Sequence, residues 1–215
     1  MSASAHAQHI GPTGRKALAL RFKMGPIPAL PDFPPADAGW LPLREPSLWV
    51  AQLSAVPIAV AIVFGFAWAW TLVGGAAWAK ATMPTVFAFI VPVLIVAVPL
   101  HEVVHALVHP HLGLSDATTL GIWPRKVVLY AHYEGELSRR RFVLMLVAPF
   151  VLLSVAPYLL CAALSVAPPP VVALTIANGA AACVDLLGAA LVAFQLPRGS
   201  VVRNNGDRTW WRIAA

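Results

Sequence analysis

Residues 98–111 read VPLHEVVHALVHPH, and this stretch decides the fold that we expect for the chain. It places His101, Glu102 and His105 in the spacing HExxH, inside a run that is otherwise almost wholly apolar. Ionisable side chains are costly to place in a hydrophobic helix, so a cluster of this kind is expected to have a function. The stretch therefore predicts a membrane-spanning helix that carries a polar site.

The composition of the whole chain agrees with a membrane protein. Of its 215 residues, 59% are hydrophobic and 11% are charged, and the mean hydropathy is +0.75. The charged share of an ordinary soluble domain is about 25%. The formal net charge is +6, but the basic residues flank apolar runs instead of forming one soluble face, so we expect no nucleic-acid partner. The composition predicts the lipid bilayer as a partner.

Apolar runs long enough to cross the roughly 30 Å hydrocarbon core of a bilayer occur four times. They cover residues 48–73, 84–108, 142–165 and 171–195. The sequence thus predicts an all-α membrane protein, a bundle of four transmembrane helices. The expected division is a disordered N-terminal tail over residues 1–47, a membrane domain over residues 48–195, and a C-terminal tail over residues 196–215.

The Lys and Arg residues indicate how this bundle is oriented. All 15 of them except Lys80 lie in the two tails and in the loop between the second and third runs. Four crossings place these three segments on one side of the membrane. By the positive-inside rule that side is cytoplasmic, so we expect cytoplasmic N and C termini.

The loop after the motif contains β-forming residues. Residues 118–122 and 126–133 are rich in β-branched and aromatic side chains, on either side of Trp123 and Pro124. We therefore expect a short β-hairpin-like loop between helices two and three. A free strand edge there could pair with an extended peptide. The alternative is a structural connector.

The HExxH spacing suits a zinc site. Residues four apart share one helix face, roughly 6 Å apart along the axis, so His101 and His105 can direct imidazole nitrogens to one ion. Zinc lowers the pKa of a bound water to about 7, and Glu102 would act as general base and then as general acid for the leaving amine. The alternative is a helix contact in which these side chains hydrogen-bond one another.

A catalytic zinc needs a third protein ligand, and Asp185 is the candidate. It is the only acidic residue of the fourth run, and it lies at about the depth of His101, roughly 22 to 26 Å from the side where both helices enter. The alternative is a hydrogen bond to a neighbouring helix. His109 lies about 12 Å along the helix from His101, too far to share the ion, and is expected to be interfacial. His132 is expected to be solvated in the loop.

Asn178 precedes Asp185 by two helical turns and lies on nearly the same face. It is a candidate for positioning the substrate or the transition state through a hydrogen bond. A plain hydrogen bond between helices is the equal alternative. The small residues 179–182 beside it would allow close approach of helix two.

Three segments carry a resemblance to known proteins. They are HEVVHALVHP (residues 101–110), LYAHYEGELSRRRFVLMLVAPF (residues 129–150) and NGAAACVD (residues 178–185). Over about residues 100–203 the chain resembles the family of small bacterial membrane proteins named "putative zincin peptidase", and more distantly the site-2 class of intramembrane metalloproteases. The resemblance to the site-2 class implies a site built from His101, Glu102, His105 and Asp185, and Asn178 matches an asparagine upstream of the aspartate.

Together these observations predict a zinc metalloendopeptidase of the bacterial cell (inner) membrane. It would hydrolyse a peptide bond of a membrane protein near the cytoplasmic face, with His101, His105 and Asp185 as zinc ligands. The alternative is a noncatalytic membrane protein that uses the same cluster for metal binding or helix assembly. The sequence does not specify the oligomeric state.

Overall fold

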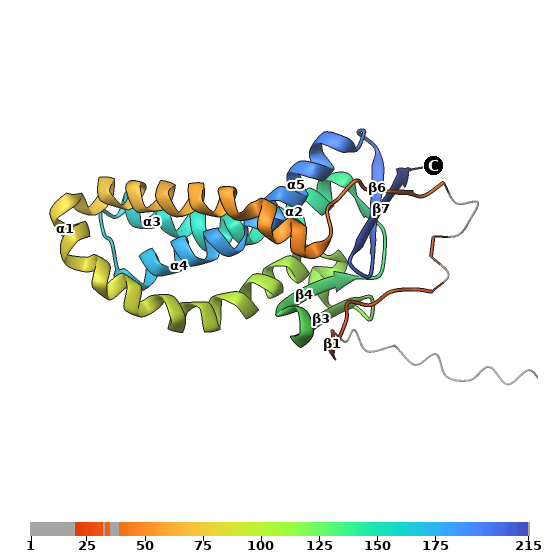
Figure 1. The fold of residues 1–215 in the computed structure, drawn as a ribbon, viewed down its shortest axis with the longest axis horizontal. Helices are drawn as coiled ribbons and strands as arrows, with labels where there is room; N and C mark the ends of the chain where they lie inside the picture. The colour runs from red at the N-terminus through yellow and green to blue at the C-terminus, as the bar shows by residue number, and fades with distance from the viewer. Residues whose placement is uncertain (1–19, 32, 35–38, 215) are drawn as a thin grey trace, which may run out of the picture.

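A computed structural model describes residues 20–31, 33–34 and 39–214 of the chain. Long helices make up one end of the molecule, and short strands gather at the other end (Figure 1). The site lies where the two parts meet.

The longest element, α1 (Leu48–Val108), consists of two helices that run back along each other (Figure 1). The reversal occurs at Gly75, whose φ of +81° and ψ of 163° are not helical. Glycine adopts such a conformation without steric cost because it has no Cβ. We call residues 48–74 the first leg of α1 and residues 76–108 its second leg.

The remaining helices complete the bundle. They are α2 (Arg139–Phe150), the π-helical turn η3 (Val151–Val155), α3 (Ala156–Ala163), α4 (Pro169–Ala181) and α5 (Cys183–Gln195). α2, η3 and α3 form one rod of 25 residues. α4 and α5 are bent by 47° at their junction. The two legs of α1, the α2–α3 rod and the α4–α5 pair are the counterparts of the four expected helices.

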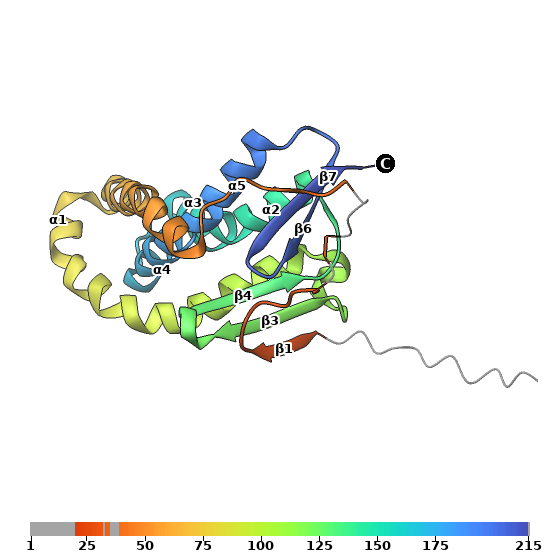
Figure 2. The ribbon, with the colours of Figure 1, turned by 45° about the vertical axis from the view of Figure 1, so that its right-hand side comes forward.

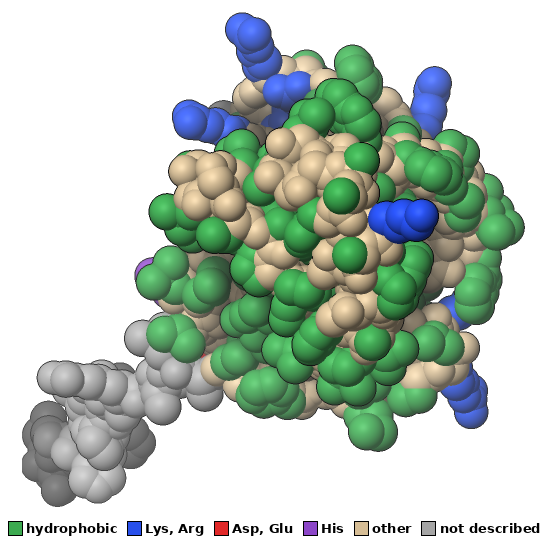
Figure 3. Space-filling view, turned by 90° about the vertical axis from the view of Figure 1, so that its left-hand side faces the viewer, with side chains coloured by type: hydrophobic (Ala, Val, Ile, Leu, Met, Phe, Trp, Pro, Cys, Tyr) green, Lys and Arg blue, Asp and Glu red, His purple; other side chains and the backbone are tan. Residues whose placement is uncertain are grey.

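The hydropathy of these helices suits a membrane. α1 and the α2–α3 rod are each long and apolar enough to cross one, with a mean hydropathy of 2.4, and the α4–α5 pair is a third candidate if it counts as one span. Large apolar side chains point outward, including Leu53, Phe64, Phe87 and Ile95. The end at which α1 reverses is largely hydrophobic (Figure 3). Lipid solvates such a surface, whereas water does not.

Inside the bundle, α4 packs against the first leg of α1. The indole Nε1 of Trp70 donates a hydrogen bond of 2.8 Å to Thr175 Oγ1, and Trp70 is fully buried. A Cβ on Gly179 would lie 2.8 Å from Ile62 Cγ2. The close approach expected at residues 179–182 is therefore made at Gly179 with the first leg, and not with the second leg as the sequence suggested.

Two small sheets stand at the other end of the molecule (Figure 2). The first contains β1 (Arg21–Met24), β3 (Thr118–Trp123) and β4 (Val128–Tyr133) in the order β1-β3-β4. β3 and β4 form the expected antiparallel hairpin, joined by the 3-10 turn η2 (Pro124–Lys126). β1 pairs with β3 in parallel, so the outer edge of β3 is not free, and β4 is the other edge strand.

The second sheet joins distant parts of the chain. Its order is β2 (Leu41–Pro42), β7 (Arg208–Ile213), β6 (Ser200–Asn205) and β5 (Leu137–Ser138). All its pairings are antiparallel. The 3-10 turn η1 (Pro110–Gly113) leads from α1 towards β3.

The expectation of an all-α protein was wrong, because the described chain has a mixed α and β architecture. Both tails contribute strands, including β1 and β2 from the stretch expected to be disordered. These strands span two to six residues and find partners across the whole bundle, so local periodicity does not reveal them. The same expectation for residues 1–19, 32 and 35–38 falls outside the described residues.

Candidate metal centre

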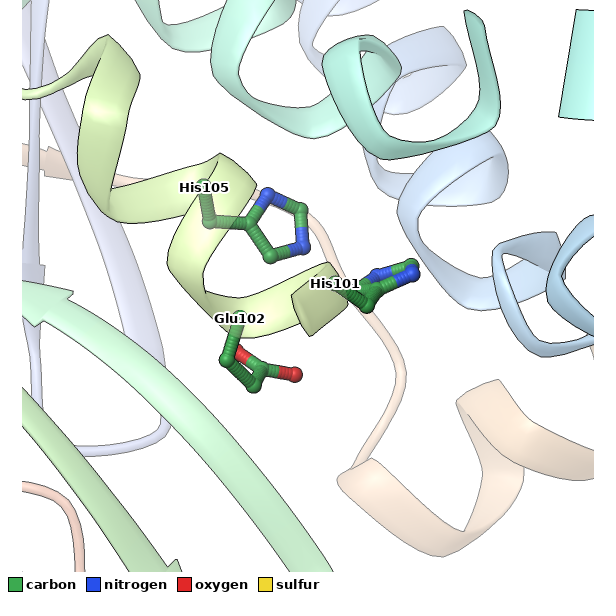
Figure 4. A group of neighbouring side chains, drawn as sticks. All are labelled: His101, Glu102 and His105. Atoms are coloured by element: carbon green, nitrogen blue, oxygen red, sulfur yellow. The ribbon is translucent and has the colours of Figure 1, made fainter. Parts of the chain in front are cut away.

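The HExxH residues lie near the end of the second leg of α1. The side chains of His101 and His105 point to one side of the helix and Glu102 points to another (Figure 4). Both histidines are 6% exposed. Potential ligand atoms of the three residues lie within 4.8 Å of one another. The i, i+4 spacing thus brings the two imidazoles together as the sequence predicted.

Asp185 meets the two imidazoles from the first turn of α5. Its Oδ2 lies 2.9 Å from His101 Nε2, and its Oδ1 lies 3.6 Å from His105 Nε2. The bend between α4 and α5 at Ala182 lies three residues before it. One carboxylate therefore faces both Nε2 atoms, although 84 residues separate it from His101 in the chain.

The other nitrogen of each imidazole has its own partner. His101 Nδ1 lies 3.0 Å from Asn178 Oδ1, and His105 Nδ1 lies 2.8 Å from the carbonyl oxygen of Met145. A carbonyl oxygen can only accept, so His105 carries its proton on Nδ1. The amide oxygen of Asn178 assigns the same tautomer to His101. Nε2 of each ring then faces the Asp185 carboxylate, and at 2.9 Å His101 Nε2 donates a hydrogen bond to Asp185 Oδ2 unless a metal ion lies between them.

The side-chain amide of Asn178 makes hydrogen bonds to two other helical segments. Its Nδ2 donates to the carbonyl of Pro149 at 3.1 Å and to Ser154 Oγ at 2.9 Å, while its Oδ1 accepts from His101. The residue is 1% exposed. Of the two alternatives for Asn178, the interhelical hydrogen bond is the one seen, and the side chain lies behind His101.

This donor set fits zinc. Two imidazoles and one carboxylate are ligand types that zinc takes, and ligand atoms around a tetrahedral zinc lie roughly 3.3–3.5 Å apart. The Nε2 and carboxylate oxygen atoms here are 2.9 and 3.6 Å apart. A histidine that binds metal usually donates its second ring N–H to a carbonyl or carboxylate, and both Nδ1 atoms have an acceptor of this type.

Glu102 faces a groove instead of the bundle. The groove has a volume of about 520 Å³ and lies between the second leg of α1 and the first sheet. The carboxylate of Glu102 lies beside the backbone amide of Ala131 in β4. The other walls are almost entirely apolar and come from three strands and one helix: Phe22, Met24, Leu120, Ile122, Leu129, Pro99 and Val103.

Two further histidines are more buried than the sequence suggested. His109 is fully buried, with its ring 5.3 Å from the ring of Tyr133 and its Nδ1 3.4 Å from Thr118 Oγ1. His132 is 3% exposed, and burial lowers its pKa from 6.5 to about 4. Neither residue is interfacial or solvated, because the two sheets pack over the end of α1 and cover them.

A comparison with protein families bears on this site. A family model described as "Putative zincin peptidase" matches residues 94–201, which is half of the chain. The chain belongs to this family. The zincin peptidase match runs from the second leg of α1 into β6 and includes His101, Glu102, His105 and Asp185. No match was found among curated proteins or among solved structures.

Family membership confirms the resemblance to the putative zincin peptidases and implies zinc as the metal of the His-Glu-His cluster. Sequence reasoning missed the supports behind the ligands, namely Met145 and Ser154. A backbone carbonyl leaves no signal in a side-chain pattern. Ser154 does leave one, since it is a polar residue in the middle of the apolar run 142–165.

Proposed function

We propose that the protein is a membrane-embedded zinc metallopeptidase that hydrolyses a peptide bond of a membrane protein near the cytoplasmic face. The observation that carries this proposal is the convergence of His101 Nε2, His105 Nε2 and the Asp185 carboxylate beside a groove that contains Glu102. A noncatalytic metal site needs no such groove, so the groove favours catalysis over the noncatalytic alternative.

In this proposal each side chain has one task. His101, His105 and Asp185 hold the metal, and Asn178 and the Met145 carbonyl fix the two imidazole rings from behind. Bound zinc supplies a Lewis acid that lowers the pKa of water to about 7 and polarises the peptide carbonyl. A carboxylate oxygen of Glu102 takes the proton from the attacking water and then delivers it to the leaving amine nitrogen.

The groove indicates how a peptide would reach Glu102. Apart from Lys23 on the sheet side and Glu102 on the helix side, its walls are apolar, so it suits an extended and largely apolar segment. Glu102 lies six residues before the end of α1, roughly 9 Å along the helix axis. Cleavage would then occur close to the membrane face that carries the two sheets. Of the two edge strands, β1 and β4, it is β4 whose Ala131 lies beside Glu102, so its edge would pair with a peptide.

The test uses solubilised bacterial membrane proteins as a substrate pool. Purified protein in detergent is incubated with this pool, and new amino termini are identified by mass spectrometry. Wild type should generate termini that Glu102→Gln does not, with a loss of at least about 100-fold, because general acid–base catalysis contributes 10² to 10⁴. Both proteins should retain one zinc per chain.

The matched control is Glu134→Gln, since Glu134 pairs with Arg21 and does not line the groove. This variant should generate the same termini as wild type. The same termini from Glu102→Gln would overturn the proposed mechanism. A wild type that binds zinc but generates no new termini would overturn the peptidase assignment in favour of a noncatalytic metal site.

A further inference from the structure

The bonds behind both histidines end on one short stretch of the α2–α3 rod. His105 donates to the carbonyl of Met145. Asn178, which holds His101, donates to the carbonyl of Pro149 and to Ser154 Oγ. Met145, Pro149 and Ser154 are all buried. Residues 145–154 therefore provide the acceptors that hold both imidazoles in place, directly for His105 and through Asn178 for His101.

The carbonyl of Met145 is available because of the residue four positions later. In an α-helix the carbonyl of residue i accepts from the N–H of residue i+4. For Met145 that residue is Pro149, which has no N–H. The usual helical donor is thus missing at the one carbonyl that His105 Nδ1 reaches, at 2.8 Å.

This arrangement determines which nitrogen of His105 faces the ligand cluster. A carbonyl with an unfilled acceptor position holds the proton on Nδ1, so that Nε2, which faces Asp185, is the nitrogen left to bind a metal ion. With a helical N–H at position 149, the same carbonyl would have two donors in competition. The imidazole would be held less firmly and the opposite tautomer would be less disfavoured.

We propose that Pro149 is a positioning residue for His105, because by lacking an N–H it leaves the Met145 carbonyl free to fix the orientation and tautomer of the imidazole. This inference rests on the proposed metal centre. A proline inside a helix costs about 3 kcal/mol, and the rod departs from α-helical geometry directly after it, at η3. π-helical turns of this kind occur frequently at functional sites.

Pro157 provides a matched comparison within the same rod. It too lacks an N–H, and the carbonyl four residues before it belongs to Leu153. Within the described part of the chain, the Leu153 carbonyl is not among the acceptors of side-chain hydrogen bonds, whereas the Met145 carbonyl is. Replacing either proline by alanine restores a helical N–H, but only the change at Pro149 adds a competitor for His105.

The experiment measures zinc affinity of the full chain in detergent, by competition with a chelating indicator and without substrate. Pro149→Ala should bind zinc about 10- to 100-fold more weakly than wild type, which is the range for loss of a support behind a metal ligand. Pro157→Ala should stay within about threefold of wild type. The cobalt(II) absorption spectrum should change in Pro149→Ala and remain unchanged in Pro157→Ala.

A second variant distinguishes the effect of the missing N–H at position 149 from the effect of the proline ring. It carries lactic acid at position 149, introduced by chemical synthesis, and so has an ester oxygen in place of the N–H and a methyl group in place of the ring. This chain should bind zinc like wild type, and it keeps the inference testable if Pro149→Ala fails to fold.

Wild-type affinity in Pro149→Ala would overturn the inference, and so would weak binding in the ester chain. Either result leaves the proposed function standing, provided that wild type binds zinc. A wild type without zinc affinity would instead contradict the metal centre itself. The failure of the inference and the failure of the proposed function are thus distinguishable.

Discussion

His101 and His105 show why a metal centre involves more than its ligands. Each ring uses Nε2 towards Asp185 and Nδ1 towards an acceptor on another helix. The acceptors keep a proton on each Nδ1 and orient both rings before any ion arrives. Preorganisation of this kind lets the binding free energy of a metal go into coordination and not into the ordering of side chains.

Removal of the acceptor behind His101 should weaken metal binding. We expect Asn178→Ala to lower zinc affinity by about 10- to 100-fold, because the Nδ1 proton loses its acceptor. The control is Thr175→Val on the same helix, which removes the partner of Trp70 away from the site. This control should lower stability by about 1 to 3 kcal/mol and leave zinc affinity unchanged. Chelator competition and thermal unfolding measure the two quantities, and equal loss of affinity in both variants would contradict the role of Asn178.

His132 should make stability depend on pH. Burial lowers its pKa in the folded protein from 6.5 to about 4, so between these values the unfolded chain binds a proton that the folded chain does not. The stabilising contribution is complete above about pH 6.5 and is lost as the pH falls towards 4, by at most about 3 kcal/mol.

Thermal unfolding in detergent at pH 7 and pH 5 measures this effect. Wild type should lose stability on acidification, and His132→Gln should lose less. His111→Gln changes an exposed histidine and should behave like wild type. A wild type whose midpoint is the same at both pH values would contradict the prediction.

Among the elements, the reversal within α1 depends on the backbone conformation of one residue, Gly75. Gly75 has φ +81° and ψ 163°, a conformation that side chains with a Cβ adopt at a cost of about 1 to 3 kcal/mol. We expect Gly75→Ala to destabilise the protein by this amount. Gly65→Ala is the control, since a Cβ there meets no atom within 4 Å, and it should be neutral or stabilise by up to about 1 kcal/mol. Denaturation of both variants in detergent checks the difference, and equal effects would mean that the reversal does not need glycine.

The helices and the hairpin could be predicted because their signals are local. Apolar length indicated the spans, and the β-branched residues around Trp123 indicated β3 and β4. β1 and β2 gave no such signal, because the four residues of β1 acquire their partner strand about a hundred residues later in the chain.

In the site, the HExxH spacing and the depth of Asp185 could be predicted from helix geometry. The Met145 carbonyl was not readable, since its role depends on which helix packs behind His105.

For the molecule as a whole, the described strands of both tails and the hairpin lie at the same end of the bundle (Figure 1). In a membrane, the pairing of β1 with β3 and of β2 with β7 would require an even number of crossings between the partners. By the positive-inside rule we propose that this end faces the cytoplasm.

Cysteine labelling in whole cells tests that orientation. In a chain whose Cys161 and Cys183 are replaced by alanine, a membrane-impermeant maleimide should label Lys80→Cys in intact cells. It should label Arg198→Cys only after the cells are opened. Both positions are exposed. The reverse pattern would place the metal centre near the opposite face.

The parallel pairing of β1 with β3 also sets an order for biosynthesis. β1 leaves the ribosome long before β3, and the two legs of α1 lie between them. The sheet that walls the groove is therefore completed only after both legs of α1 have been synthesised and the chain has returned to the end of the bundle where it began. Asp185 is translated later still, so a ribosome-bound chain holds Glu102 without its metal centre. The proposed hydrolytic activity would then begin only after α5, which carries Asp185, has been synthesised.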